Sequence, residues 1–269
     1  MGFEDAVRGA FRRGDTDAVV GMAKAEVVRA REAGDAAGEV EALYALSRVA
    51  LRGGELVRAE ELAREALSVA VGAAGLVGRE AGGGGGGGRE AGGGGREAGG
   101  GGREAGGRGL EERPRHVLAA VARLSGNYEL ARERYLASIA LNEELGRPEA
   151  VNSESYNLAF TELRLGNRDR ARELFAEVRE RVFREGYDSF VPYLGVAASA
   201  LAAADGDDEL AARMIGLTDA AYAEIGQVPD PDDAQELSAA REKAIMALGE
   251  AAFGREYEAG RALTPRDAL

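Results

Sequence analysis

The sequence predicts an all-α solenoid of about five helix-turn-helix repeats, closed by a C-terminal helical cap. A glycine recurs with a period of about forty residues, at Gly14, Gly54, Gly126, Gly166 and Gly206. Five residues after each glycine stands a small side chain that opens an apolar run at helical spacing: Val19, Ala59, Ala131, Ala171 and Ala211. A fixed period of this size is typical of helical solenoids, in which stacked repeats build one continuous core.

One interval of the repeat is irregular, because Gly54 and Gly126 are 72 residues apart. The segment from Arg79 to Gly109 consists of imperfect copies of Arg-Glu-Ala-Gly-Gly-Gly-Gly, and without its 31 residues the interval is 41. Glycine maximises backbone entropy, and the few alanines here do not offset the cost of ordering the segment. We therefore expect a disordered insertion in a loop between repeats. A phosphate-binding loop is disfavoured, because the segment contains no Gly-Lys-Ser/Thr.

These boundaries divide the chain into four parts. Residues 1–78 contain the first two repeats, 79–109 the glycine-rich insertion, 110–228 repeats three to five, and 229–269 the capping helices.

Proline and glycine place the ends of the expected helices. Pro114 and Pro192 lie where first helices of a pair begin, a position that proline tolerates well. After Pro229-Asp230-Pro231, either Asp232 or Asp233 is expected to cap a helix that runs to about Leu248. A final helix is expected from about Glu250 to Gly260.

The composition narrows the class of protein. The formal charge of −13 disfavours nucleic-acid binding, which needs a basic surface to neutralise phosphates. From Asp205 onward fifteen acids face six bases, a net charge of −9, so a local basic groove remains possible earlier in the chain. The chain has no cysteine, and no stretch has the length of a membrane span or the apolar core of a signal peptide. We expect a cytoplasmic protein that binds no membrane.

The units resemble tetratricopeptide repeats. In the third unit Leu118, Ala119 and Ala122 lie on the first helix, Gly126-Asn127-Tyr128 forms the turn, and Ala131, Tyr135 and Ser138 lie on the second. The fourth follows with Leu158, Ala159, Gly166-Asn167, Ala171, Phe175 and Val178. The resemblance covers nearly all of the chain outside the insertion. The period exceeds the usual length of about 34 residues, which implies longer helices or longer loops between repeats.

The stretch from Gly206 to Leu269 resembles the C-terminal repeat region of large actinobacterial ATP-binding (LuxR/SARP-like) transcriptional regulators. It contains Ala211-Ala212-Arg213-Met214-Ile215-Gly216 and, later, Ala247-Leu248-Gly249-Glu250. The chain has neither a phosphate loop nor a recognisable DNA-binding helix-turn-helix. The resemblance therefore implies a sensor or scaffold part alone.

In tetratricopeptide-like repeats the first helices line the concave face, and their outward residues select the partner. This register predicts a groove that combines arginines with aromatic and polar side chains: Arg8, Arg12, Arg48, Arg52, Arg123 and Arg164, with Phe11, Tyr44, His116, Tyr156, Asn157 and Phe160 interleaved. Arginine suits bidentate recognition of carboxylates, and aromatic rings add rigid apolar contact. The hypothesis is a groove for an acidic or C-terminal peptide segment. The alternative is that the arginines pair with glutamates on neighbouring turns while the aromatic residues fill the core.

Other polar clusters carry little chemistry. His116 is the single histidine and has no cysteine companion, so the sequence predicts no metal site, no cofactor and no nucleophilic catalysis at it. Asp205, Asp207, Asp208 and Glu209 crowd one turn but lack the ligand spacing of a helix-loop-helix calcium site. We expect a solvated acidic turn.

The sequence thus favours a non-enzymatic scaffold or regulatory module that binds a protein, peptide or helix in its concave groove. The alternative is a regulatory domain that senses an anionic small molecule at the same arginine and aromatic positions.

Overall fold

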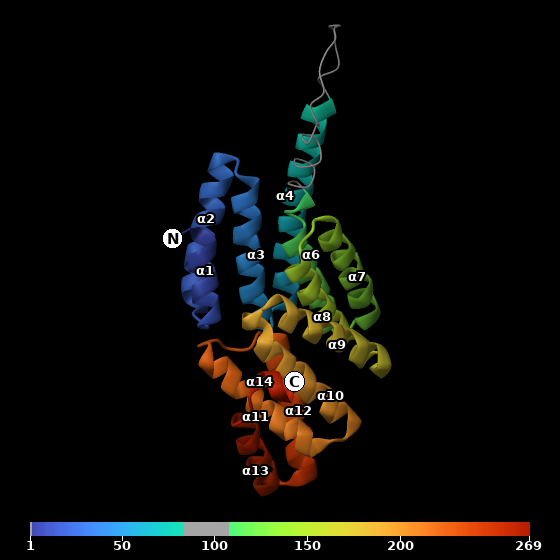
Figure 1. The fold of residues 1–269 in the computed structure, drawn as a ribbon. Helices are drawn as coiled ribbons and strands as arrows, with labels where there is room; N and C mark the ends of the chain where they lie inside the picture. Colours follow the sequence, from blue (N-terminus) through green and yellow to red (C-terminus); the bar gives the residue numbers. More distant parts are fainter. Residues whose placement is uncertain (1, 83–107) are drawn as a thin grey trace.

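The computed structural model describes residues 2–82 and 108–269, and all regular structure in these ranges is helical. Five helix pairs follow one another through the described residues (Figure 1). They are α1 (Phe3–Arg12) with α2 (Thr16–Ala33), α3 (Ala36–Arg52) with α4 (Leu56–Gly82), α6 (Glu112–Leu124) with α7 (Tyr128–Glu144), α8 (Pro148–Arg164) with α9 (Arg168–Glu185), and α10 (Val191–Asp205) with α11 (Asp208–Glu224).

The helices pack mainly on their neighbours in sequence, as in a solenoid. Helix α4 packs against α6, so the stack continues across the residues that separate them. The 3₁₀ turn η1 (Asp188–Phe190) precedes α10, which packs more closely on α11 than on α9. The predicted all-α helical-repeat fold is confirmed. None of the described helices combines the length and the apolar character that a membrane span requires.

The turns depend on glycine in the left-handed region of backbone space. The five glycines of the forty-residue period have φ between 73° and 83°. Four more glycines with positive φ each stand twenty residues after one of them, at Gly34, Gly146, Gly186 and Gly226. Side chains other than glycine are strained at positive φ, so one glycine ends nearly every helix. Turn glycines therefore recur every twenty residues, once for nearly every helix. The forty-residue period identified only every second one.

The small residue after each turn lies at the contact between helices. Val19, Ala59, Ala131, Ala171 and Ala211 all have no exposed surface. Four residues further on, Ala23, Ala63, Tyr135 and Ile215 are also fully buried, and Phe175 is 5% exposed. Small side chains let the helix axes approach closely, and the larger ones fill the space between the pairs.

The long period comes from long helices. Most helices from α2 to α11 have 15 to 18 residues, and the turns between them are short. Helix α4 is longer still and continues to Gly82, so residues 79–82 of the expected insertion are helical. At the other end of the expected insertion, Arg108 donates a hydrogen bond to Glu144, and the carbonyl of Gly109 accepts one from Arg147. The remainder of the predicted insertion, residues 83–107, lies outside the described residues.

The cap comprises α12 (Pro231–Leu248), α13 (Glu250–Arg261) and the short α14 (Pro265–Ala268). Its two longer helices match the expected ones, but the predicted cap of α12 was wrong. Asp230 occupies the N-cap position, with no side-chain capping bond. Asp232 and Asp233 lie in the first turn, and their carboxylates contact residues of α6 and α8 instead.

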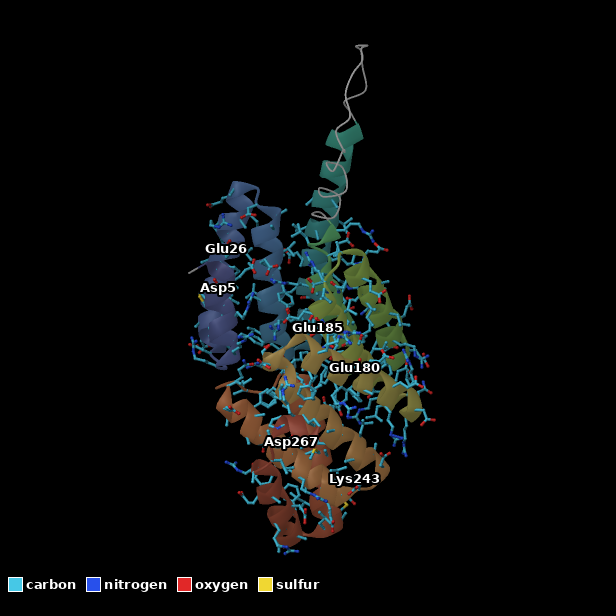
Figure 2. All side chains as sticks on the ribbon, in the orientation of Figure 1. Asp5, Glu26, Glu180, Glu185, Lys243 and Asp267 are labelled. Atoms are coloured by element: carbon cyan, nitrogen blue, oxygen red, sulfur yellow. The ribbon has the colours of Figure 1, made fainter. Side chains whose placement is uncertain are left out.

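Side chains fill the space between neighbouring helices, and charged residues such as Asp5, Glu180 and Asp267 lie at the exposed surface (Figure 2). The cap is held by an unusually close contact between α11 and α13. A Cβ atom on Gly216 would overlap the carbonyl oxygen of Tyr257, and one on Gly260 would overlap that of Arg213. Both obstacles are backbone atoms, so neither position has room for a side chain.

We predict that Gly260→Ala destabilises the fold by about 2–4 kcal/mol, because α13 must move away from α11 and lose packing. Urea unfolding followed by circular dichroism measures this loss. Gly254→Ala on the same helix is the control, because nothing lies within 4 Å of the added methyl group. It should leave stability unchanged or raise it by up to about 1 kcal/mol. Equal effects of the two substitutions would contradict the close-contact interpretation.

Candidate functional site

A cavity of about 460 Å³ lies on the face formed by the first helices of repeats one to four. We call it the groove. Its walls come from α1, α3, α6 and α8, together with η1, Tyr193 of α10 and the segment from Gln227 to Asp233. Nine of the twelve predicted groove residues line it: Arg8, Phe11, Arg12, Tyr44, Arg48, Arg52, His116, Tyr156 and Asn157. An adjoining cavity of about 520 Å³ shares Tyr44, Arg113 and His116 with it.

Three predicted residues do not line the groove. Arg123 is 5% exposed, and Phe160 is 1% exposed and packs edge to face against Tyr156. Arg164 forms an ion pair with Glu236 of α12 at 2.6 Å. The physical reason is the cap, because α12 covers this end of the face and brings carboxylates to both arginines.

Two arginines of α3 share one phenylalanine and one carboxylate. The guanidinium carbons of Arg48 and Arg52 lie 3.9 and 4.0 Å from the centre of the Phe11 ring. Both donate hydrogen bonds to Asp230 Oδ1, at 3.0 and 3.1 Å. Tyr193 donates to Asp230 Oδ2 at 3.4 Å. Stacking and ion pairing together fix the orientation of both guanidinium groups.

The sequence did not predict which acidic residues contact the arginines Arg123 and Arg164. Asp232 pairs with Arg123, and Glu236 lies 3.7 Å from Arg123 and 2.6 Å from Arg164. The available signal was the concentration of negative charge beyond Asp205, opposite arginines on earlier first helices. The sequence pattern does not place that charge in the fold. Its position against the groove follows from the way α12 folds back.

Asp233 is a buried carboxyl group, 3% exposed, that accepts a hydrogen bond from the Tyr156 hydroxyl at 2.7 Å. Burial raises the pKa of Asp233 well above its ordinary value, and the charges of Asp232 and Asp230 raise it further. Burial also raises the pKa of Tyr156. The fold therefore favours the neutral form of both side chains.

His116, at the wall of the groove, pairs with the buried carboxylate of Glu154. Its Nδ1 lies 3.1 Å from Glu154 Oε1, which also accepts a hydrogen bond from Ser138 at 3.0 Å. Burial alone would lower the pKa of His116, but the charge and hydrogen bond of Glu154 outweigh burial and raise it. Glu154 is 2% exposed and His116 28%, so the pair links the groove lining to the interior.

Some arginines do pair along their own helix, as the alternative interpretation expects. Arg8 lies 3.9 Å from Glu4, one turn away. Most pairs of the groove arginines are instead made between distant elements. Elsewhere, Asp207 caps α11 by accepting from the Leu210 amide at 3.0 Å, and Asp205 pairs with Arg172. Within the described residues no group of three or more potential ligands could hold a metal ion.

The comparisons with known proteins show the fold alone. No protein-family model matches the chain, and no curated protein matches it in sequence. Among solved structures it is similar to BtubC (BKLC) from P. vanneervenii, with a TM-score of 0.51. The two chains are 19% identical, and the match covers 94% of this chain and 92% of the other. The class that the structure defines is an α-solenoid of helix pairs.

We predict that Asp233→Asn stabilises the protein at neutral pH. A carboxyl group with a raised folded pKa contributes its full stability below its unfolded pKa, and this contribution is lost as pH rises through the folded pKa. The amide keeps the acceptor for Tyr156 and never ionises. Urea unfolding at pH 4 and 7 should show the gain at pH 7 only. Asp232→Asn is the control and should destabilise by about 3 kcal/mol, because it removes a charge partner of buried Arg123.

The His116 pair predicts a second pH dependence. The folded pKa of His116 is raised above its ordinary value of 6.5. The contribution of the pair to the free energy of unfolding is therefore complete below a pH of about 6.5, and it disappears as the pH rises through the folded pKa. The unfolding free energy of the wild type should therefore fall between pH 5.5 and 8.5 relative to that of His116→Gln. Parallel pH profiles for the two proteins would contradict this assignment.

Proposed function

We propose that the chain is a non-enzymatic interaction module, built of tetratricopeptide-like repeats, that binds a peptide or helix of a partner protein in the groove. The observation that carries the proposal is the lining of the groove, where arginines from separate repeats alternate with aromatic rings on a face of rigid helices. Such a surface supplies bidentate donors and apolar contact area with little conformational entropy to lose on binding.

The charges of the groove support binding rather than chemistry. Arg48 and Arg52 are engaged with Asp230, Arg113 with Glu41, and His116 with Glu154. These pairs hold side chains in place, as recognition requires. The resemblance to the repeat region of large regulators would give the module a regulatory role.

The size of the cavity is also compatible with a second function, the binding of a small molecule. A volume of about 460 Å³ falls in the range of small-molecule sites, which is about 300–1,000 Å³. A sensing domain for an anionic ligand would use the same arginines.

We predict that Arg8→Glu/Arg12→Glu weakens partner binding at least tenfold. Both side chains line the groove from α1 and are exposed, so the substitutions should leave the fold intact. Proteins captured from cell extract on the immobilised wild type should be lost on this variant. Their peptide segments should then bind the wild type but not this variant in calorimetry.

The matched control is Arg58→Glu/Arg64→Glu, which makes the same change of charge at exposed positions of α4 outside the groove. It should capture what the wild type captures. Identical capture by all three proteins would reject the groove. A metabolite that raises the melting temperature of the wild type and of the control, but not of the α1 variant, would favour the sensing function.

A further inference from the structure

The segment from Gln227 to Glu236 follows the last repeat and runs along the first helices from the first repeat to the fourth. It leaves α11 after Gly226, and the Val228 amide donates to the carbonyl of Arg12 at 3.4 Å. In Figure 1 this loop lies beside the end of α1, far from it in sequence. A Cβ atom on Gly14 would lie 3.8 Å from Cγ2 of Val228, so the Val228 side chain stands beside this turn. The chain therefore lays a loop and the start of α12 along a face formed by the first helices.

The carboxylates of this segment occupy arginines of three helices. Asp230 pairs with Arg48 and Arg52 of α3, Asp232 with Arg123 of α6, and Glu236 with Arg123 and Arg164 of α8. All four arginines belong to the set that the repeat register assigned to recognition of an acidic peptide. The segment supplies carboxylates at the first, third and seventh positions of the stretch from 230 to 236.

The two ends of the segment are held differently. Arg123 is buried with Asp232 and Glu236 at the start of α12, which is anchored by the buried residues Leu237, Ala240 and Ala244. Asp230 instead lies on the loop, its side chain 25% exposed, against Arg48 at 29% and Arg52 at 15%. Pro229 and Pro231 flank it and have no amide hydrogen to bond. The Asp230 contact is accessible to solvent and to a competing ligand, whereas the residues that anchor α12 are buried.

We propose that residues 227–233 are an internal ligand of the groove, and that the external partner is an acidic peptide segment that displaces Asp230 from Arg48 and Arg52. The inference rests on the proposed function and adds the chemistry of the partner and the regulation of the site. Charge complementarity carries it, because the structure already contains a carboxylate seated on the two stacked guanidinium groups. A tethered ligand acts at high effective concentration, so a partner must bind strongly or the segment must be released.

The test uses a labelled peptide of the chain's own residues 226–238, Gly-Gln-Val-Pro-Asp-Pro-Asp-Asp-Ala-Gln-Glu-Leu-Ser, added to the full chain. Asp230→Lys should release the internal segment by repulsion from Arg48 and Arg52. We expect the peptide to bind this variant at least tenfold more tightly than the wild type in fluorescence anisotropy. Asp169→Lys, which makes the same change of charge at a fully exposed position of α9, should bind it like the wild type.

Two further arms decide the result. Adding Arg48→Gln and Arg52→Gln to Asp230→Lys should remove the gain, and a peptide with asparagine at its three aspartate positions should not bind. Equal affinity of wild type and Asp230→Lys, or equal binding of the neutral peptide, would overturn the internal-ligand proposal. Circular dichroism checks that each variant keeps its helices.

The outcome is distinguishable from that of the proposed function. Peptide binding that depends on Asp230→Lys and on Arg48, with no cellular protein captured through the groove, supports the internal ligand and rejects the external role. Capture that depends on Arg8 and Arg12, with no effect of Asp230→Lys on peptide affinity, does the reverse.

Discussion

The architecture depends on one backbone constraint, the positive φ with which the chain reverses direction after most of the described helices. Gly146 and Gly166, which end two successive helices, have φ of 64° and 83°. The left-handed cap sets the same reversal each time, so the next helix begins at a fixed angle. After the five glycines of the forty-residue period, the fully buried small residue five positions on then sets the distance between the paired helices. The reversal repeated every twenty residues and this distance repeated every forty build a stack in which the first helices of the pairs share one face.

Ion pairs between the first helices and α12 determine the electrostatics of the groove face. First helices bring arginines from distant repeats to one side, and α12 returns across them with carboxylates. Where the pairs are buried, as at Arg123, they fix the position of the cap, because an unpaired buried charge is strongly destabilising. Where they are partly exposed, as at Arg48, solvent weakens them and leaves room for exchange. One acidic segment thus combines a structural end and an exchangeable end.

The sequence predicted what depends on local rules and missed what depends on long-range folding. Turn glycines and small residues act within one helix pair, so the period identified the pairs and their register. Arg12, Arg52 and Arg164 each stand two residues before a turn glycine and are equivalent by that register. In the structure two of them line the groove and Arg164 pairs with Glu236. The difference comes from the path of α12, which no period encodes. The burial of Asp233 was missed for the same reason.

The bond between Val228 and Arg12 has a mechanical consequence. A solenoid in which each repeat touches only its neighbours bends easily, because small rotations at successive interfaces add up along its length. A contact between the first and last repeats fixes the distance between them and forces those rotations to cancel. The loop from Gln227 to Asp230 therefore restrains the bending of the whole solenoid. Release of this loop would make the solenoid easier to bend without changing any individual helix.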